Sequence, residues 1–277
     1  MSKEIVSADW LFKNLNNNNL IVLDASLEST IGGIVPENND KVIPTSRFFD
    51  LKNNFCDKNS SYPNTLPPEQ QFEEECQKLG INKSSQIVVY DNHGVYSSPR
   101  VWWMFKVMGH ENVVVLDGGL PEWIGKGYDT VEKVNEKYIP GNFKASFQSR
   151  FVKTYKDILQ NTKLDSFQVV DARSNGRFKG IEKEPRKYLK SGHIPNSINI
   201  PYQNVLKKGK FKSVEDLKEI FEQKCSHSKA MVFTCGSGLT ACIVMLAAEI
   251  SFKESKTIYD GSWTEWAELQ GLKEIAE

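Results

Sequence analysis

A single cysteine near the C-terminal end of the chain lies in a context that favours nucleophilic chemistry. Cys235 follows a short apolar run, Met231 to Thr234, which is typical of a buried strand. Small residues come next, and from Thr240 a second apolar run has the length of a helix. A strand, a tight loop and a helix N-terminus would surround the sulfur with backbone N–H groups, and the helix dipole also favours a thiolate. The pattern predicts a thiolate nucleophile, the alternative being a buried cysteine that only packs.

Ser237 is the most notable polar residue in the loop. Its hydroxyl would polarise a substrate carbonyl or move a proton, unless it is present only because the loop is tight. Cys242 lies within the second apolar run and is expected in the core. Ser237 is therefore the first candidate to assist Cys235.

Two arginines could bind an anion beside this thiolate. Arg177 and Arg186 lie in a segment punctuated by Gly and Pro, which predicts a surface loop between two strands. Arginine binds a carboxylate through paired, charge-assisted hydrogen bonds. The residues alone leave open a solvated basic loop neutralised by Glu182 and Glu184.

Histidines are not expected to act in catalysis here. His193 is expected to be structural, in a turn that enters a strand, and His93 is expected to be a bystander. His110 and His227 fall near the ends of predicted elements and are expected on the surface.

Composition excludes several function classes. The chain has 277 residues, of which 39% are hydrophobic, and its 35 basic residues balance 35 acidic ones. Bulk charge therefore gives no reason to expect a nucleic acid or a membrane as partner. The five cysteines lack metal-ligand spacing, so no metal site is predicted, and Cys56 and Cys76 are expected to be exposed or half-buried bystanders. The small number of cysteines and an N-terminus without an apolar signal core predict a cytoplasmic protein. The sequence does not indicate an oligomeric state.

The two halves of the chain repeat one plan of alternating helices and strands. The strand expected at 86–90 matches the one before Cys235, and Asp91 stands at the cysteine position. Because a carboxylate cannot perform thiolate chemistry, only the second copy is expected to be catalytic. The sequence predicts an α/β fold with a degenerate domain at 1–130, a linker at 131–150 and a catalytic domain at 151–277, each with a mainly parallel sheet and helices on both faces.

Motifs spread over nearly the whole chain resemble those of the rhodanese-type sulfurtransferases. In chain order they are residues 6–10, 99–105, 116–120, 176–178, 184–186, 192–195, 235–241 and 259–263. Within that family, thiosulfate enzymes carry basic residues just after the cysteine, whereas mercaptopyruvate enzymes carry Gly and Ser, as Gly236 and Ser237 do here. The resemblance therefore implies two tandem rhodanese-like domains and a sulfurtransferase of the mercaptopyruvate branch. Mitochondrial localisation also occurs in the family and is the alternative to the cytoplasm.

The resemblance also implies a mechanism. Cys235 would take the sulfur of 3-mercaptopyruvate as a persulfide and release pyruvate, and thioredoxin, a small thiol or cyanide would then accept the sulfur. By resemblance, Arg177 and Arg186 bind the carboxylate and keto oxygen of the substrate. The family chemistry needs no metal or organic cofactor. The resemblance also implies that Gly236, Gly238, Leu239 and Thr240 form the loop that holds the transferred sulfur.

One departure from the family pattern concerns proton transfer. In the family, the loop Ser pairs with a His and an Asp from the first domain, but Asn64 stands at the His position here. Lys52 falls at the Asp position, and Asp50 or Asp57 is the alternative. Asn cannot accept and return a proton, so Ser237 is expected to act as a hydrogen-bond donor.

Three other functions compete with this assignment. A thiosulfate:cyanide sulfurtransferase and a non-catalytic persulfide carrier remain alternatives. A phosphatase on the related fold is excluded, because its loop is one residue longer and ends in Arg, whereas Ala241 and Cys242 occupy that distance here.

Overall fold

The computed structural model describes residues 4–27, 40–133 and 137–273, and it divides the chain into two compact units. The first unit contains residues 1–58, 66–148 and 207–211, and the second contains 59–65, 149–206 and 212–277. Residues 134–136 of the predicted linker lie outside the described part. The described part of the linker includes one short strand, β7 (Val131–Glu132), which pairs antiparallel with β3 (Lys41–Val42).

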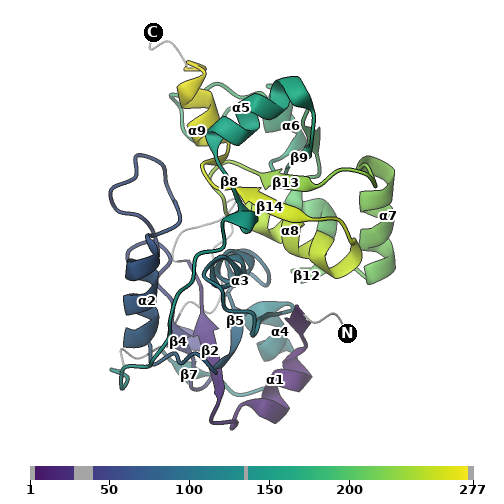
Figure 1. The fold of residues 1–277 in the computed structure, drawn as a ribbon. Helices are drawn as coiled ribbons and strands as arrows, with labels where there is room; N and C mark the ends of the chain where they lie inside the picture. The colour runs from purple at the N-terminus through teal and green to yellow at the C-terminus, as the bar shows by residue number, and fades with distance from the viewer. Residues whose placement is uncertain (1–3, 28–39, 134–136, 274–277) are drawn as a thin grey trace. The chain divides into compact units, whose positions relative to one another are not determined.

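The first unit is built on a five-stranded parallel sheet with the order β1-β6-β5-β2-β4 (Figure 1). Its strands are β1 (Ile5–Val6), β2 (Leu20–Asp24), β4 (Arg47–Phe48), β5 (Gln86–Tyr90) and β6 (Val113–Leu116). Its helices are α1 (Ala8–Asn14), α2 (Glu69–Lys78), α3 (Ser98–Val107) and α4 (Gly119–Gly125). All ten residues of α3 are buried, as its run of Trp and other apolar residues predicts.

The second unit repeats this topology, with the order β10-β9-β13-β14-β8. Its strands are β8 (Val152–Lys153), β9 (Gln168–Asp171), β10 (Ile198–Asn199), β13 (Met231–Thr234) and β14 (Lys256–Tyr259). Its helices are α5 (Tyr155–Leu164), α6 (Asn175–Phe178), α7 (Val214–Lys224), α8 (Thr240–Ser251) and α9 (Ser262–Leu269), with 3-10 turns η1 (Ser149–Phe151) and η2 (Tyr202–Val205). A further two-stranded sheet is formed by β11 (Leu206–Lys207) and β12 (Lys210–Phe211), of which residues 207–211 group with the first unit.

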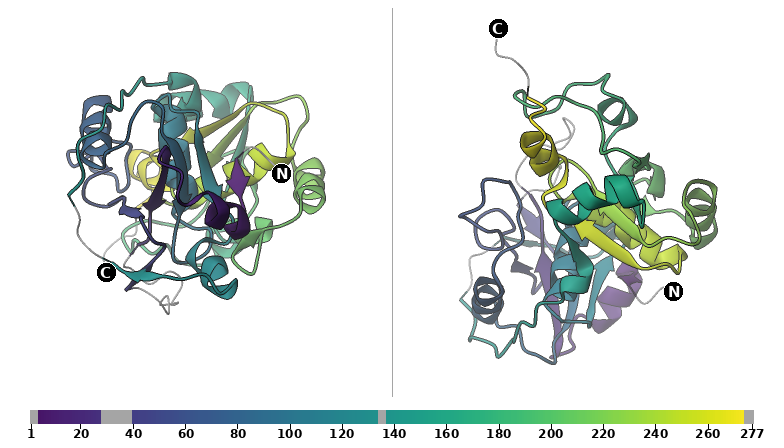
Figure 2. Two further views of the ribbon diagram at one scale, coloured as in Figure 1. Left: turned by 90° about the horizontal axis from the view of Figure 1, so that it is seen from below. Right: turned by 45° about the horizontal axis from the view of Figure 1, so that its top comes forward.

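The matching strand orders confirm the predicted α/β duplication. In each unit the strand before the loop of interest, β5 or β13, is the central strand of its sheet. Further views show the helices packed along both sheets (Figure 2). Among the described residues, no helix combines the length and the apolar character that a membrane crossing needs.

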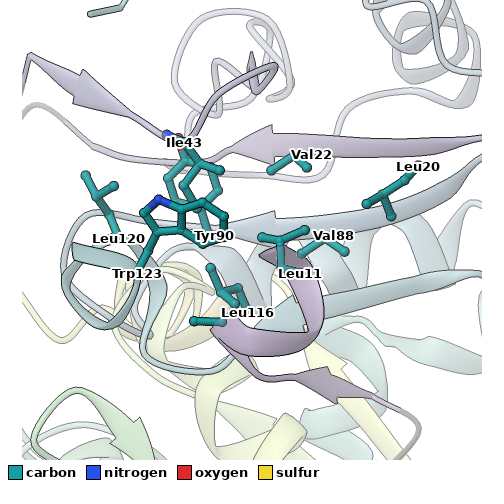
Figure 3. Packing of buried hydrophobic residues seen from close by; sticks show 10 residues of the cluster. Leu11, Leu20, Val22, Ile43, Val88, Tyr90, Leu116, Leu120 and Trp123 are labelled. Atoms are coloured by element: carbon teal, nitrogen blue, oxygen red, sulfur yellow. The ribbon is translucent and has the colours of Figure 1, made fainter. Parts of the chain in front are cut away.

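Apolar side chains from the strands alternate between the two faces of each sheet. In the first unit, Val88 and Tyr90 point to one face of β5, where they meet Leu11 of α1 and Trp123 of α4 (Figure 3). In the second unit, Trp263 of α9 belongs to the equivalent cluster. Burying this area holds the carboxyl ends of the parallel strands in register, and the loops that follow them are fixed as a consequence.

Candidate active site

Cys235 lies at the carboxyl end of β13, directly before the loop that leads into α8. The side chain is almost fully buried, at 2% exposure. The backbone N–H of Gly238 donates a hydrogen bond to its sulfur at 3.2 Å. Gly238 has a φ of 83°, in the left-handed region, which lets the chain turn tightly around the sulfur. A backbone donor aimed at sulfur is the feature that stabilises negative charge there.

The first part of this loop is held by the N-terminus of α9. Trp263 donates its backbone N–H to the carbonyl of Cys235 at 2.9 Å, and the Thr264 hydroxyl donates to the carbonyl of Gly236 at 2.7 Å. The N–H of Cys235 donates to the Ser262 hydroxyl at 3.3 Å. These bonds satisfy the loop carbonyls of Cys235 and Gly236, so the backbone around Cys235 is fixed by contacts within the fold.

Cys242 supports the loop from the core side. It is completely buried, as expected, and its S–H donates to the carbonyl of Gly238 at 3.3 Å. Gly238 is thus fixed on both sides, by Cys235 and by Cys242.

Asn64 contacts Ser237 directly. It belongs to residues 59–65, which group with the second unit. Its side-chain amide Nδ2 lies 2.9 Å from the Ser237 hydroxyl oxygen and 3.1 Å from the Ser237 carbonyl. A carbonyl only accepts, so the amide nitrogen must face Ser237 and donate to its hydroxyl as well. The hydroxyl hydrogen of Ser237 is left available for a further acceptor.

Asp50, one of the alternatives for the family Asp, accepts hydrogen bonds from residues of the turn in which it lies. Its carboxylate accepts from the N–H of Lys52 at 3.2 Å, and from both the backbone and the side-chain amide of Asn53. It caps this local turn in the first unit.

Arg177 lies in α6 and is held by a buried carboxylate. Its Nε and Nη2 donate to the two oxygens of Glu184, at 3.1 and 2.6 Å. The Glu184 side chain is 1% exposed and that of Arg177 is 19% exposed. The loop is therefore not simply solvated: one of its arginines is fixed by an internal ion pair. Glu182 instead accepts from the Ser174 hydroxyl at 2.6 Å.

Arg177 also lies against the loop. A Cβ atom added at Gly236 would come within 2.8 Å of Arg177 Nη2. A side chain at this position would therefore push against the Arg177 guanidinium, which lies beside the residue that follows Cys235. Arg186 is half-buried, and no described residue forms a hydrogen bond or ion pair with its side chain.

The equivalent loop of the first unit is filled by its own carboxylate. Asp91 is fully buried and accepts from the backbone N–H groups of His93, Tyr96, Ser97 and Ser98, and from the Ser98 hydroxyl. The backbone N–H groups of this loop, which could otherwise stabilise a bound anion, therefore already donate to the Asp91 carboxylate.

Two expectations about exposure were wrong. His110 is buried, at 7% exposure, because it packs on Phe105 and Phe143 and its Nε2 lies 2.9 Å from the carbonyl of Ser85. Cys76 is completely buried in α2, and burial raises the pKa of its thiol well above the usual value. Cys56 is half-buried, as expected, and burial raises its pKa too.

Sequence reasoning assigned no role to Arg173. This side chain is fully buried between Asp171 and Glu184, and its guanidinium lies 4.4 Å from the centre of the Trp263 ring. A charged residue directly after a predicted buried strand was the signal that could have drawn attention to it.

Comparison with known proteins finds matches to both halves of the chain. A family model described as "Rhodanese-like domain" matches residues 7–126 and 152–269. The chain is 40% identical over 276 residues to 3-mercaptopyruvate sulfurtransferase of Homo sapiens, covering 96% of this chain and 92% of the relative. It is 39% identical to the mitochondrial thiosulfate/3-mercaptopyruvate sulfurtransferase 1 of Arabidopsis thaliana, covering 96% of this chain and 76% of the relative.

A solved structure has the same fold. SseA from Escherichia coli is 30% identical, with a TM-score of 0.82, and the match covers 94% of this chain and 98% of SseA. The family model matches the chain twice, and the two matches together cover well over half of it. The chain therefore belongs to the rhodanese family and contains two rhodanese-like domains.

Proposed function

We propose that this protein is a 3-mercaptopyruvate sulfurtransferase, with Cys235 as the nucleophile. The observation that carries the proposal is the loop itself: a buried cysteine receives a backbone N–H bond, the residues that follow are uncharged Gly and Ser, and a guanidinium lies beside them. Relatives named for 3-mercaptopyruvate, at about 40% identity over nearly the whole chain, support the same donor.

In the proposed reaction the Cys235 thiolate attacks the sulfur of 3-mercaptopyruvate. A sulfur–sulfur bond forms and the carbon–sulfur bond breaks, so the electron pair passes to the enolate of pyruvate, which a proton then converts to pyruvate. Arg177 and Arg186 would hold the carboxylate and keto oxygen. The free hydroxyl hydrogen of Ser237 is suited to donate a hydrogen bond to the oxygen on which negative charge develops.

The persulfide would remain in the loop until an acceptor takes its outer sulfur. The N–H of Gly238 already donates to sulfur, and we propose that Gly236, Leu239 and Thr240 complete the loop that receives the persulfide. Thioredoxin, a small thiol or cyanide would attack the outer sulfur and leave Cys235 as thiolate. We place this activity in the cytoplasm, with mitochondria as the alternative because one relative is named as mitochondrial.

The direct test is mass spectrometry of the protein after treatment with 3-mercaptopyruvate. We expect one added sulfur atom on the peptide that contains Cys235, removed by cyanide, and no addition in Cys235→Ser. Cys56→Ser serves as the matched control, because this half-buried cysteine belongs to the first unit. Full sulfur transfer by Cys235→Ser would contradict the proposal.

A thiosulfate:cyanide sulfurtransferase is the second candidate, because a similar relative carries both donors in its name. Initial rates with each donor separate the two, and the uncharged Gly236–Ser237 pair predicts a higher kcat/KM with 3-mercaptopyruvate. A carrier that holds persulfide without catalysis would instead show a single turnover.

A further inference from the structure

A buried cluster of four charged side chains extends from the end of β9 to the loop after Cys235. Asp171, Arg173 and Glu184 are at most 1% exposed at their side chains, and Arg177 is 19% exposed. Arg173 donates to both carboxylates, through Nη2 to Asp171 at 2.6 Å and through Nη1 to Glu184 at 2.8 Å. Two positive and two negative charges therefore balance inside the cluster.

Within this cluster, Glu184 binds only one edge of the Arg177 guanidinium. It takes the side-on edge, formed by Nε and Nη2. Arginine has five N–H donors, so both hydrogens of Nη1 and one of Nη2 remain. One hydrogen of Nη1 and the remaining hydrogen of Nη2 form the end-on edge, whose parallel geometry matches a single planar carboxylate.

The free edge is held at a defined place. Nη2 lies 2.8 Å from the position that a Cβ of Gly236 would occupy, so the guanidinium contacts the loop beside the nucleophile. Glu184 is itself held by Arg173, and Arg173 by Asp171, by the carbonyl of Gly192 and by the ring of Trp263. Arg177 therefore cannot turn without breaking a buried ion pair.

We propose that Glu184 is a positioning residue that sets donor specificity, an inference that rests on the sulfurtransferase function proposed above. It fixes Arg177 with its end-on edge toward the donor, and it cancels one positive charge next to the site. A donor with one planar carboxylate fits this arrangement. A compact dianion such as thiosulfate gains less, because its attraction to the site grows with net positive charge.

The test is Glu184→Gln, which keeps the shape and removes the charge. We expect the KM for 3-mercaptopyruvate to rise about tenfold with kcat changed less than about twofold, since uniform binding of the carboxylate is lost. The ratio of kcat/KM for 3-mercaptopyruvate to that for thiosulfate should fall by about tenfold, because the dianion gains more from the added net charge. Glu182→Gln is the matched control, being an exposed carboxylate of the same loop that contacts Ser174 rather than Arg177.

A second variant covers the case in which Glu184→Gln does not fold, as judged by circular dichroism. Gly236→Ala places a methyl group against Nη2, and a guanidinium held by Glu184 cannot yield. We expect the KM for 3-mercaptopyruvate to rise at least about fivefold. Gly125→Ala is its control, because nothing lies within 4 Å of a Cβ there.

The outcomes separate this inference from the function on which it rests. If the wild-type protein forms no persulfide at Cys235, the proposed function itself fails. If the wild type forms it, but Glu184→Gln or Gly236→Ala keeps the wild-type KM and the wild-type donor ratio, only the role of Glu184 is overturned.

Discussion

Ser237 receives a hydrogen bond from a group that cannot act as a base. The Asn64 amide donates to the Ser237 hydroxyl and carbonyl, so it orients the hydroxyl without removing its proton. A His at this position would be able to accept that proton and return it. At the level of single residues, this contact supports the prediction that Ser237 acts as a fixed hydrogen-bond donor, and the role itself stays a prediction.

Replacing Asn64 tests this difference. Asn64 has a φ of 60°, a left-handed conformation that His also adopts more readily than most residues, so Asn64→His should fold. We expect it to raise kcat with 3-mercaptopyruvate, because a titratable relay is restored. Asn64→Ala, which removes the donor, should lower kcat by about tenfold or more. Steady-state kinetics with cyanide as acceptor measure both, and an unchanged kcat in Asn64→His would mean that the relay does not limit turnover.

At the level of helices and loops, the ends of helices determine where the important side chains and loop carbonyls lie. α9 donates to the loop carbonyls beside Cys235, and α6 presents Arg177. In the first unit, the loop after α3 inserts His110 between aromatic rings, and burial lowers the pKa of this imidazole. Its Nε2 donates to the carbonyl of Ser85, which requires the neutral form with the proton on Nε2 or the charged form.

This burial predicts a pH dependence of stability. The folded-state pKa of His110 lies below its value of 6.5 in the unfolded chain, so the stability that neutral His110 supports is present above pH 6.5 and is lost as pH falls through the folded pKa. His110→Gln keeps a donor for Ser85 but does not titrate. We expect the Tm of the wild type to fall more between pH 7.5 and 5 than that of the variant, with His227→Gln, at an exposed position, as control. Parallel Tm curves for wild type and His110→Gln would contradict this.

At the scale of the whole molecule, the two units share one fold but differ in the residue that follows the central strand. Cys235 directly follows the central strand of the second unit, and its sulfur receives a backbone donor. Asp91 directly follows the central strand of the first unit, and its carboxylate uses the donors of its own loop. The carboxylate of Asp91 therefore stabilises the first unit and leaves no comparable anion site there.

Asp91→Ala should show how much this filled loop contributes. Removing the carboxylate leaves several buried donors without an acceptor, so the free energy of unfolding should fall by about 3 kcal/mol or more. Denaturant unfolding measures the effect, and Asp129→Ala, at an exposed position of the same unit, should change it little. A loss equal to that of Asp129→Ala would show that the donors find other partners.

The sequence by itself determined the plan of the fold and the duplication, and it predicts Cys235 as the nucleophile. Strand and helix patterns are local, and the contrast of Asp91 with Cys235 appears as soon as the halves are aligned. The contacts of Arg177 depended on tertiary structure, because sequence alone could not tell whether Glu184 would be solvated or buried. The same holds for His110, whose place near an element end suggested exposure until packing enclosed it. Burial decides both cases, since the energy of a charge or an imidazole depends on which distant side chains exclude water from it.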